Sequence, residues 1–220
     1  MNKTEVLERI REIRLMPLFY HDDPAIAMNV MKAVMEGGME LLEFTNRGEN
    51  AYKVFRELQK YESENHPDFL LGIGSIVDAK TAFRYIGAGA DFVVSPLLSR
   101  EVMEACSEKG VLCIPGCSTL TEIHQAENWG AELVKVFPAE QLGGPAYIKA
   151  IKGPCPWLSL IVTGGVKATT ENIKSYHDAG AEGFGLGSDL ISKAWIQASE
   201  YAAISEKVSE LVRFVKGLER

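Results

Sequence analysis

The chain has 220 residues, 46% of them hydrophobic, which is enough to bury a full hydrophobic core. Its formal net charge is −7 at pH 7, which argues against non-specific binding to nucleic acid but allows a local basic pocket for a small anion. The charged N-terminal segment lacks the apolar run of a signal peptide or membrane span, so we expect a cytoplasmic location and no membrane partner. The four cysteines and four histidines show no metal-ligand spacing, and we expect no metal site.

Apolar, strand-like segments recur along the chain with helix-like segments between them. A charged, helix-periodic segment at residues 1–11 comes first. Asp23 and Pro24 then predict the start of a helix that ends at Gly37 and Gly38. The tail, residues 201–220, predicts a closing amphipathic helix. The predicted strands cover residues 15–20, 41–45, 70–75, 91–96, 111–116, 133–138, 160–163 and 183–187.

Alternation of short strands with helices, repeated about every 25 residues, is typical of an α/β protein with parallel strands. Eight such units favour a (β/α)8 barrel (TIM barrel) over an open, doubly wound sheet. A dinucleotide-binding fold is disfavoured, because no Gly-x-Gly-x-x-Gly motif opens the first unit. We therefore expect residues 1–220 to form one barrel domain with an extra N-terminal helix.

A lysine and a glutamate stand inside predicted buried strands, where a charge loses its hydration. Lys135 lies in the sixth strand and Glu43 in the second. If both side chains point into the barrel, they meet in one confined space, where burial can leave the lysine amine neutral and nucleophilic. A buried salt bridge without a catalytic purpose is the structural alternative.

Further candidates lie at strand ends, where barrels of this kind place their active sites. Arg47 follows the second strand, and its guanidinium suits a substrate carboxylate, although a single arginine is more often a surface residue. Residues 163–166 and 185–188 end the last two strands and resemble a phosphate cradle, whereas glycines that merely permit tight turns are the alternative. Asp189 would repel phosphate unless it points outward as a helix cap, and Lys167 could offset its charge.

Several motifs resemble those of the 2-keto-3-deoxy-6-phosphogluconate (KDPG) aldolases and 4-hydroxy-2-oxoglutarate aldolases, a class I family with a (β/α)8 fold. The likeness spans most of the chain. Ser75 replaces the usual threonine, Leu97 stands where a glycine usually follows Ser-Pro, and Gly48 stands where threonine is common. The matching segments are residues 42–47, 72–75, 95–96, 114–119, 135–140, 163–165 and 187–188.

The resemblance implies an enzyme, a carbon–carbon lyase that reversibly cleaves a KDPG-type or 4-hydroxy-2-oxoglutarate-type substrate to pyruvate and an aldehyde. It implies that Lys135 forms the Schiff base and that Glu43 is the general acid/base. It also implies no cofactor and no metal, a small-molecule 2-keto acid as substrate, and a homotrimer. The residues implied to bind substrate are Arg47, Ser75, Pro96, Phe137 and Thr163, and those implied to bind phosphate are Gly164, Gly165, Gly187 and Ser188.

Three other functions stay open at this point. A barrel isomerase or decarboxylase could use the same phosphate site, with Lys135 as an electrostatic group or base. A metal-dependent pyruvate aldolase could use Glu43 as a ligand. A non-catalytic phosphosugar-binding protein could share the fold. The sequence leaves open which aldehyde is released, whether the substrate is phosphorylated and which C4 stereochemistry is accepted.

Overall fold

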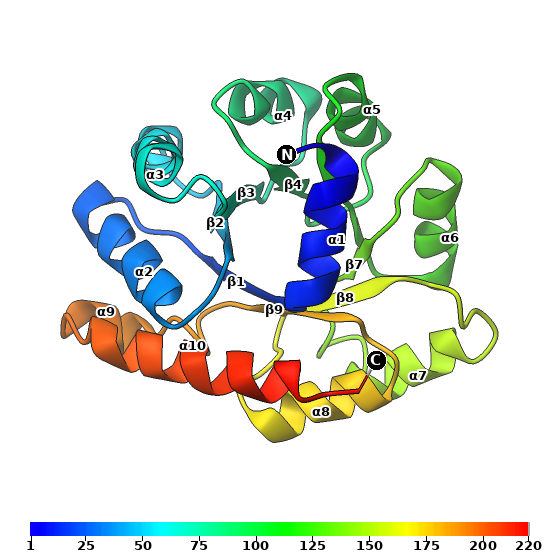
Figure 1. Cartoon of the computed structure of the whole chain (residues 1–220). Helices are drawn as coiled ribbons and strands as arrows, with labels where there is room; N and C mark the ends of the chain where they lie inside the picture. The colour runs from blue at the N-terminus through cyan, green and yellow to red at the C-terminus, as the bar shows by residue number, and fades with distance from the viewer. Residues whose placement is uncertain (220) are drawn as a thin grey trace.

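Short parallel strands form the centre of the molecule, and helices surround them (Figure 1). The structure is a computed structural model and describes residues 1–219. The strands within this range are β1 (Leu15–Phe19), β2 (Leu41–Thr45), β3 (Leu70–Gly74), β4 (Phe92–Val94), β5 (Leu112–Ile114), β6 (Gly116–Cys117), β7 (Val134–Val136), β8 (Leu160–Thr163) and β9 (Gly183–Leu186). Their order in the sheet is β5-β4-β3-β2-β1-β9-β8-β7-β6.

The two ends of this order are neighbours in the chain, because only Pro115 separates β5 from β6. The Ser95 N–H donates to the carbonyl of Ile114 on one side, and the Lys135 N–H donates to the carbonyl of Pro115 on the other. The fifth predicted strand is therefore two short strands that pair with different neighbours and close the barrel. This confirms the (β/α)8 expectation, with the fifth strand position split at a residue that cannot donate a backbone hydrogen bond.

Side-chain caps begin several helices, and the cap of α2 lies where the sequence predicts it. The Asp23 carboxylate accepts hydrogen bonds from Ala25 and Ile26 at the start of α2, next to Pro24. Thr119 and Glu122 form a capping box at α6. The helices are α1 (Lys3–Ile13), α2 (Pro24–Glu36), α3 (Ala51–Asn65), α4 (Ala79–Ile86), α5 (Arg100–Glu108), α6 (Leu120–Asn128), α7 (Gly144–Lys152), α8 (Thr170–Asp178), α9 (Lys193–Gln197) and α10 (Tyr201–Lys216).

Side chains alternate along each strand between two hydrophobic clusters. The larger cluster lies between the strands and the outer helices. The smaller one fills the N-terminal half of the barrel interior and includes one face of α1, which lies across that end of the barrel in Figure 1. Because α1 covers the N-terminal end, the carboxyl ends of the strands are the side on which a site can open. The smaller cluster contains Val6, Leu7, Ile10, Met16, Leu41, Leu70, Phe92, Val94, Leu112, Ile114, Leu133 and Ile161.

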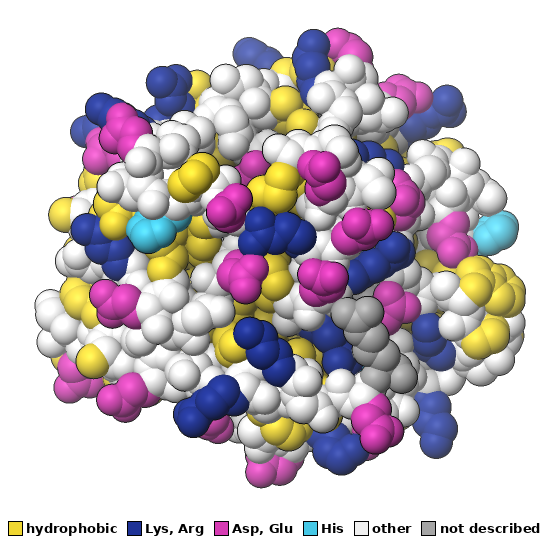
Figure 2. Space-filling view, viewed as in Figure 1, with side chains coloured by type: hydrophobic (Ala, Val, Ile, Leu, Met, Phe, Trp, Pro, Cys, Tyr) yellow, Lys and Arg dark blue, Asp and Glu magenta, His cyan; other side chains and the backbone are white. Residues whose placement is uncertain are grey.

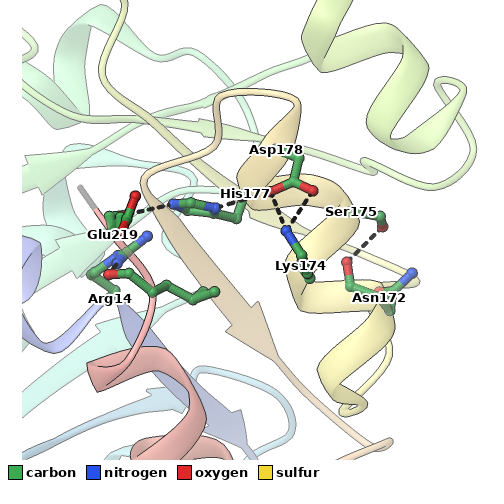
Figure 3. A network of polar contacts seen from close by, with 8 residues as sticks. Arg14, Asn172, Lys174, Ser175, His177, Asp178 and Glu219 are labelled. Atoms are coloured by element: carbon green, nitrogen blue, oxygen red, sulfur yellow. Dashed lines mark hydrogen bonds and ion pairs between the residues drawn. The ribbon is translucent and has the colours of Figure 1, made fainter.

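The face that α1 occupies carries interspersed basic and acidic side chains (Figure 2). The end of the chain is held near this face by backbone acceptors: Arg14 Nη1 donates to the Leu218 carbonyl at 3.3 Å, and His177 Nε2 lies 2.9 Å from the Glu219 carbonyl oxygen (Figure 3). Among residues 1–219, no helix is long and apolar enough to cross a membrane.

Candidate active site

Glu43 and Lys135 face each other across the barrel. Glu43 is in β2 and Lys135 in β7, and β1, β9 and β8 lie between these strands, which is half of the way around the closed sheet. Both side chains point inward, since Leu41 and Leu133, two residues earlier on the same faces, belong to the interior cluster. The structure therefore brings together the pair that the strand periodicity predicted.

Two glycines of β3 make room for this pair. Gly72 is the register partner of Glu43, and Gly74 is the register partner of Thr45. A Cβ atom on Gly74 would overlap the Glu43 carboxylate, and one on Gly72 would overlap the Phe92 ring. The β3 strand is thus open at the level of Glu43, so the carboxyl group can lie inside the barrel without displacing a neighbour.

Burial dominates the electrostatics of both groups. The residues Glu43 and Lys135 are only 2% and 5% exposed, and Glu43 Oε2 has no hydrogen-bond partner. Burial raises the pKa of Glu43, although the positive charges of Lys135 and Arg47 oppose the shift. Burial lowers the pKa of Lys135; Glu43 opposes this change and Arg47 adds to it. The site therefore favours a neutral amine and a neutral carboxylic acid more than water does.

The surroundings of the amine are partly aromatic. Lys135 Nζ lies 5.0 Å from the ring centroid of Phe137, which follows two residues later on the same face. Two hydrogen bonds hold the backbone at Phe137. Ser118 Oγ donates to the Phe137 carbonyl at 2.7 Å, and Tyr147 Oη donates to the Ser118 carbonyl at 2.8 Å. These contacts hold the Phe137 backbone next to the amine.

A cavity of about 610 Å³ opens at the carboxyl ends of the strands. Glu43 and Lys135 lie one inward position deeper than Thr45 and Phe137, which line it. Neither Glu43 nor Lys135 lines the cavity itself, so the buried pair lies directly beneath its floor. Its lining residues are Leu18, Phe19, Tyr20, Thr45, Arg47, Phe137, Thr163, Gly164, Gly165, Val166, Lys167, Gly185, Gly187, Ser188, Asp189, Ile191, Lys193 and Ile196.

Most of the predicted binding residues share this cavity: Arg47, Phe137, Thr163, Gly164, Gly165, Gly187 and Ser188. Ser75 and Pro96 are half-buried and do not line it. Ser75 follows β3 with a positive φ of 62°, and the backbone of Pro96 packs closely against Gly116. Of the predicted binding residues, these two alone lie outside the cavity lining.

The turn after β8 depends on its glycines. Gly164 and Gly165 have φ angles of 93° and 78°, which side chains disfavour. A Cβ atom on Gly164 would also press on Phe137 and Pro138, and the Glu140 N–H donates to the Gly164 carbonyl at 3.0 Å. The tight turn at Gly164 and Gly165 therefore also forms part of the cavity wall.

Asp189 makes a contact that the sequence left open. Its Oδ2 accepts a hydrogen bond from the Ala168 N–H at 2.6 Å, so the carboxylate ties the loop after β9 to the segment after β8. Within residues 1–219, no ion pair joins Lys167 to Asp189, and the lysine lines the cavity instead. Lys167 and Asp189 thus line the same cavity without a direct contact between their charges, and an offset of the Asp189 charge by Lys167 stays a prediction.

Some cavity residues had no motif to indicate them. Tyr20 lies just after β1, and its hydroxyl donates to the Asp22 carboxylate. Lys193 begins the short helix α9, and Ile191 and Ile196 add apolar wall. The only available signal was their position shortly after a strand end. Over the described range, no group of three or more His, Cys, Asp or Glu side chains is arranged to hold a metal ion.

Comparison with known proteins identifies the family. The model of the family "KDPG and KHG aldolase" matches residues 6–207, where KHG denotes 4-hydroxy-2-oxoglutarate. The 2-dehydro-3-deoxy-phosphogluconate aldolase of Haemophilus influenzae is 30% identical over 212 residues, covering 96% of this chain and 97% of that protein. The KHG/KDPG aldolase of Escherichia coli K12 is 30% identical over 190 residues, covering 86% of each chain.

A solved structure shows the same fold. The crystal structure of the KDPG aldolase from Legionella pneumophila, with pyruvate captured at low pH as a covalent carbinolamine intermediate, has a TM-score of 0.83 and 25% identity to this chain. The match covers 91% of this chain and 95% of that one. The chain therefore belongs to the KDPG and KHG aldolase family and is an aldolase, a carbon–carbon lyase.

Proposed function

We propose that this class I aldolase reversibly cleaves a 2-keto-3-deoxy-6-phosphogluconate-type or 4-hydroxy-2-oxoglutarate-type acid to pyruvate and an aldehyde through an imine on Lys135. The observation that carries the proposal is the buried Lys135 amine opposite Glu43, below a cavity at the carboxyl ends of the strands. Burial lowers the pKa of Lys135, which increases the fraction of the neutral nucleophile.

The covalent steps follow from amine chemistry. The Lys135 amine adds to the C2 carbonyl, and the carbinolamine loses water to give a protonated imine. The C3–C4 bond then breaks, its electrons move into the imine to form an enamine, and the C4 hydroxyl loses its proton as the aldehyde forms. Protonation of the enamine at C3 and hydrolysis of the imine release pyruvate and restore the amine.

Glu43 transfers the protons in this scheme. As a neutral acid it protonates the departing carbinolamine hydroxyl, and as a carboxylate it accepts the C4 hydroxyl proton directly or through water. Burial raises its pKa, which makes the carboxyl group a better proton acceptor once ionised and so suits a group that must take up and release protons. A positioned acid/base of this kind contributes roughly 10²–10⁴-fold to a rate.

Arg47 and Thr163 line the same cavity and supply the binding groups. The Arg47 guanidinium holds the carboxylate next to the C2 carbonyl, with Thr163 as a hydrogen-bond donor. Phe137 restricts water around the amine. Gly164, Gly165, Gly187 and Ser188 offer backbone N–H groups to a phosphate. Ser75 and Pro96 keep the binding roles implied by the family resemblance, from positions outside the cavity lining.

We also propose that the protein acts in the cytoplasm as a homotrimer with a small 2-keto acid as its substrate, which rests on the family resemblance. Size-exclusion chromatography with light scattering tests the oligomeric state. A mass of three chains supports the trimer, whereas a mass of one or two chains contradicts it.

Steady-state pyruvate release tests the reaction. We expect turnover of KDPG, 4-hydroxy-2-oxoglutarate, or both, and a loss of several orders of magnitude in Lys135→Met. Lys149→Met, an exposed residue of α7 outside the cavity, is the matched control and should retain wild-type activity. Absence of pyruvate release from both substrates would contradict the proposal. Phosphosugar binding without turnover would instead favour a non-catalytic protein.

A further inference from the structure

The cavity has an excess of positive charge although the chain is acidic. Arg47, Lys167 and Lys193 line it, against the single carboxylate of Asp189 at the same surface. One oxygen of that carboxylate already accepts the Ala168 N–H. The whole chain has a formal net charge of −7, so a local excess of cations is an arrangement that overall composition does not explain.

Neither Lys167 nor Lys193 pairs with a carboxylate in the described part of the chain. Among residues 1–219, Lys167 and Lys193 take part in no ion pair, whereas several other lysines of this chain do, including Lys3, Lys174 and Lys207. Both lysines are exposed, so their ammonium groups are available at the outer part of the cavity. A structural role as ion-pair partners is therefore absent for both.

The two lysines come from the two segments that form the glycine turns. Lys167 follows Gly164 and Gly165, and Lys193 follows Gly187 and Ser188. The backbone beneath each lysine is fixed: the Lys167 N–H donates to Asn172 Oδ1 at 2.8 Å, and Ser192 Oγ accepts the Ala194 N–H at 3.2 Å. The Lys167 and Lys193 side chains thus extend from backbone segments that hydrogen bonds hold in place. The apolar residues Val166, Ile191 and Ile196 line the same cavity.

We propose that Lys167 and Lys193 determine substrate specificity by binding a phosphate dianion at the end of the substrate remote from C2. The inference rests on the proposed function, in which C2 lies at Lys135 and the carboxylate at Arg47. The far end of the substrate then lies toward the outer cavity, where the two ammonium groups supply charge that the glycine turns lack. They discriminate between aldehyde fragments and take no part in bond cleavage.

The test compares three substrates: KDPG, its unphosphorylated analogue 2-keto-3-deoxygluconate, and 4-hydroxy-2-oxoglutarate. We expect Lys167→Met and Lys193→Met each to lower kcat/KM for KDPG by roughly fivefold, and the double variant by roughly 10- to 30-fold, mainly through KM. The unphosphorylated analogue should change less than twofold. Lys149→Met is the charge-matched control, and Lys167→Arg with Lys193→Arg should restore the preference for KDPG.

Two further measurements separate this inference from the proposed function. Inorganic phosphate should inhibit the wild type competitively and the double Met variant more weakly, and added salt should reduce the difference. Borohydride trapping of pyruvate should be equal in both, because pyruvate has no distal group. Failure of trapping in the wild type would defeat the proposed function itself. Normal trapping with equal losses for all three substrates, or with no loss for KDPG, would overturn only the specificity role of the two lysines.

Discussion

Replacing Glu62 with glutamine should stabilise the protein above neutral pH. Glu62 lies on the buried face of α3 and is 6% exposed. Burial raises its pKa from 4.5 to about 7, and the nearby Asp91 carboxylate contributes to the rise. Asp91 is itself held by a hydrogen bond from the Leu71 N–H to its Oδ2 at 2.8 Å. The carboxyl groups of Glu62 and Asp91 therefore lie near each other in a partly buried region, and neither residue lines the active-site cavity.

The sign follows from proton linkage. The folded-state pKa of Glu62 lies above its unfolded value, so the folded protein binds more protons between about pH 4.5 and 7. The contribution of Glu62 to the free energy of unfolding is therefore complete below about pH 4.5. It falls as the pH rises and is lost once the pH has passed about 7. A shift of this size corresponds to about 3 kcal/mol, which solvent screening reduces to about 2 kcal/mol.

The assay is urea unfolding at pH 5, 6, 7 and 8 for wild type, Glu62→Gln and Glu57→Gln, an exposed control on the same helix. The free energy of unfolding of Glu62→Gln should be closest to that of the wild type at pH 5. The difference should grow with pH to about 2 kcal/mol at pH 8, equivalent to a Tm increase of about 5 °C. Glu57→Gln should stay within about 0.5 kcal/mol of the wild type at each pH. A constant difference between Glu62→Gln and wild type across this range would refute the linkage.

Three predictions concern the active site. Gly74→Ala should lower kcat by roughly 100-fold, because the new methyl group displaces the Glu43 carboxylate. Gly153→Ala is the control and should keep its kcat, because its methyl group would meet only ordinary contacts. Pyruvate-release kinetics checks both variants. Arg47→Met should shift the acid limb of the pH profile for imine trapping to higher pH, because Arg47 lowers the pKa of Lys135. Arg47→Lys keeps the positive charge and should leave this limb near its wild-type position. An unshifted limb in Arg47→Met would count against the effect of Arg47 on the Lys135 pKa. Dialysis against a chelator should leave pyruvate release unchanged, and its loss would favour the metal-dependent alternative.

The barrel and its central pair could be predicted from the sequence because each depends on local periodicity. Short apolar strands at a regular spacing predict parallel strands, and the two-residue period places Glu43 and Lys135 on inward faces once the sheet closes. The split of the fifth strand at Pro115 was not predicted. Which neighbour each carbonyl of that strand would meet depends on the closure of the whole barrel, which a single strand does not encode.

The outer part of the site was harder to predict because it depends on how loops fold back. Lys193 belongs to a five-residue helix after the last strand, and no motif marks it as a cavity residue. Asp189 was expected to repel phosphate unless it pointed outward as a helix cap. Its observed hydrogen bond to the Ala168 N–H requires two loops to meet that are 21 residues apart in sequence. Ser75 and Pro96 belong to matching motifs, yet their strand ends leave them outside the cavity lining. Motif position alone did not resolve these contacts.

The central claim is that Lys135 is the imine-forming residue, and borohydride reduction in the presence of pyruvate tests it most directly. Peptide mass spectrometry should find the mass of one reduced pyruvyl group on Lys135 and on no other lysine, with loss of activity in proportion to labelling. Lys135→Met should take up no label under the same conditions, and Lys149→Met should label as the wild type does. A pyruvyl group on a different lysine, or no label in an active wild-type enzyme, would contradict the account.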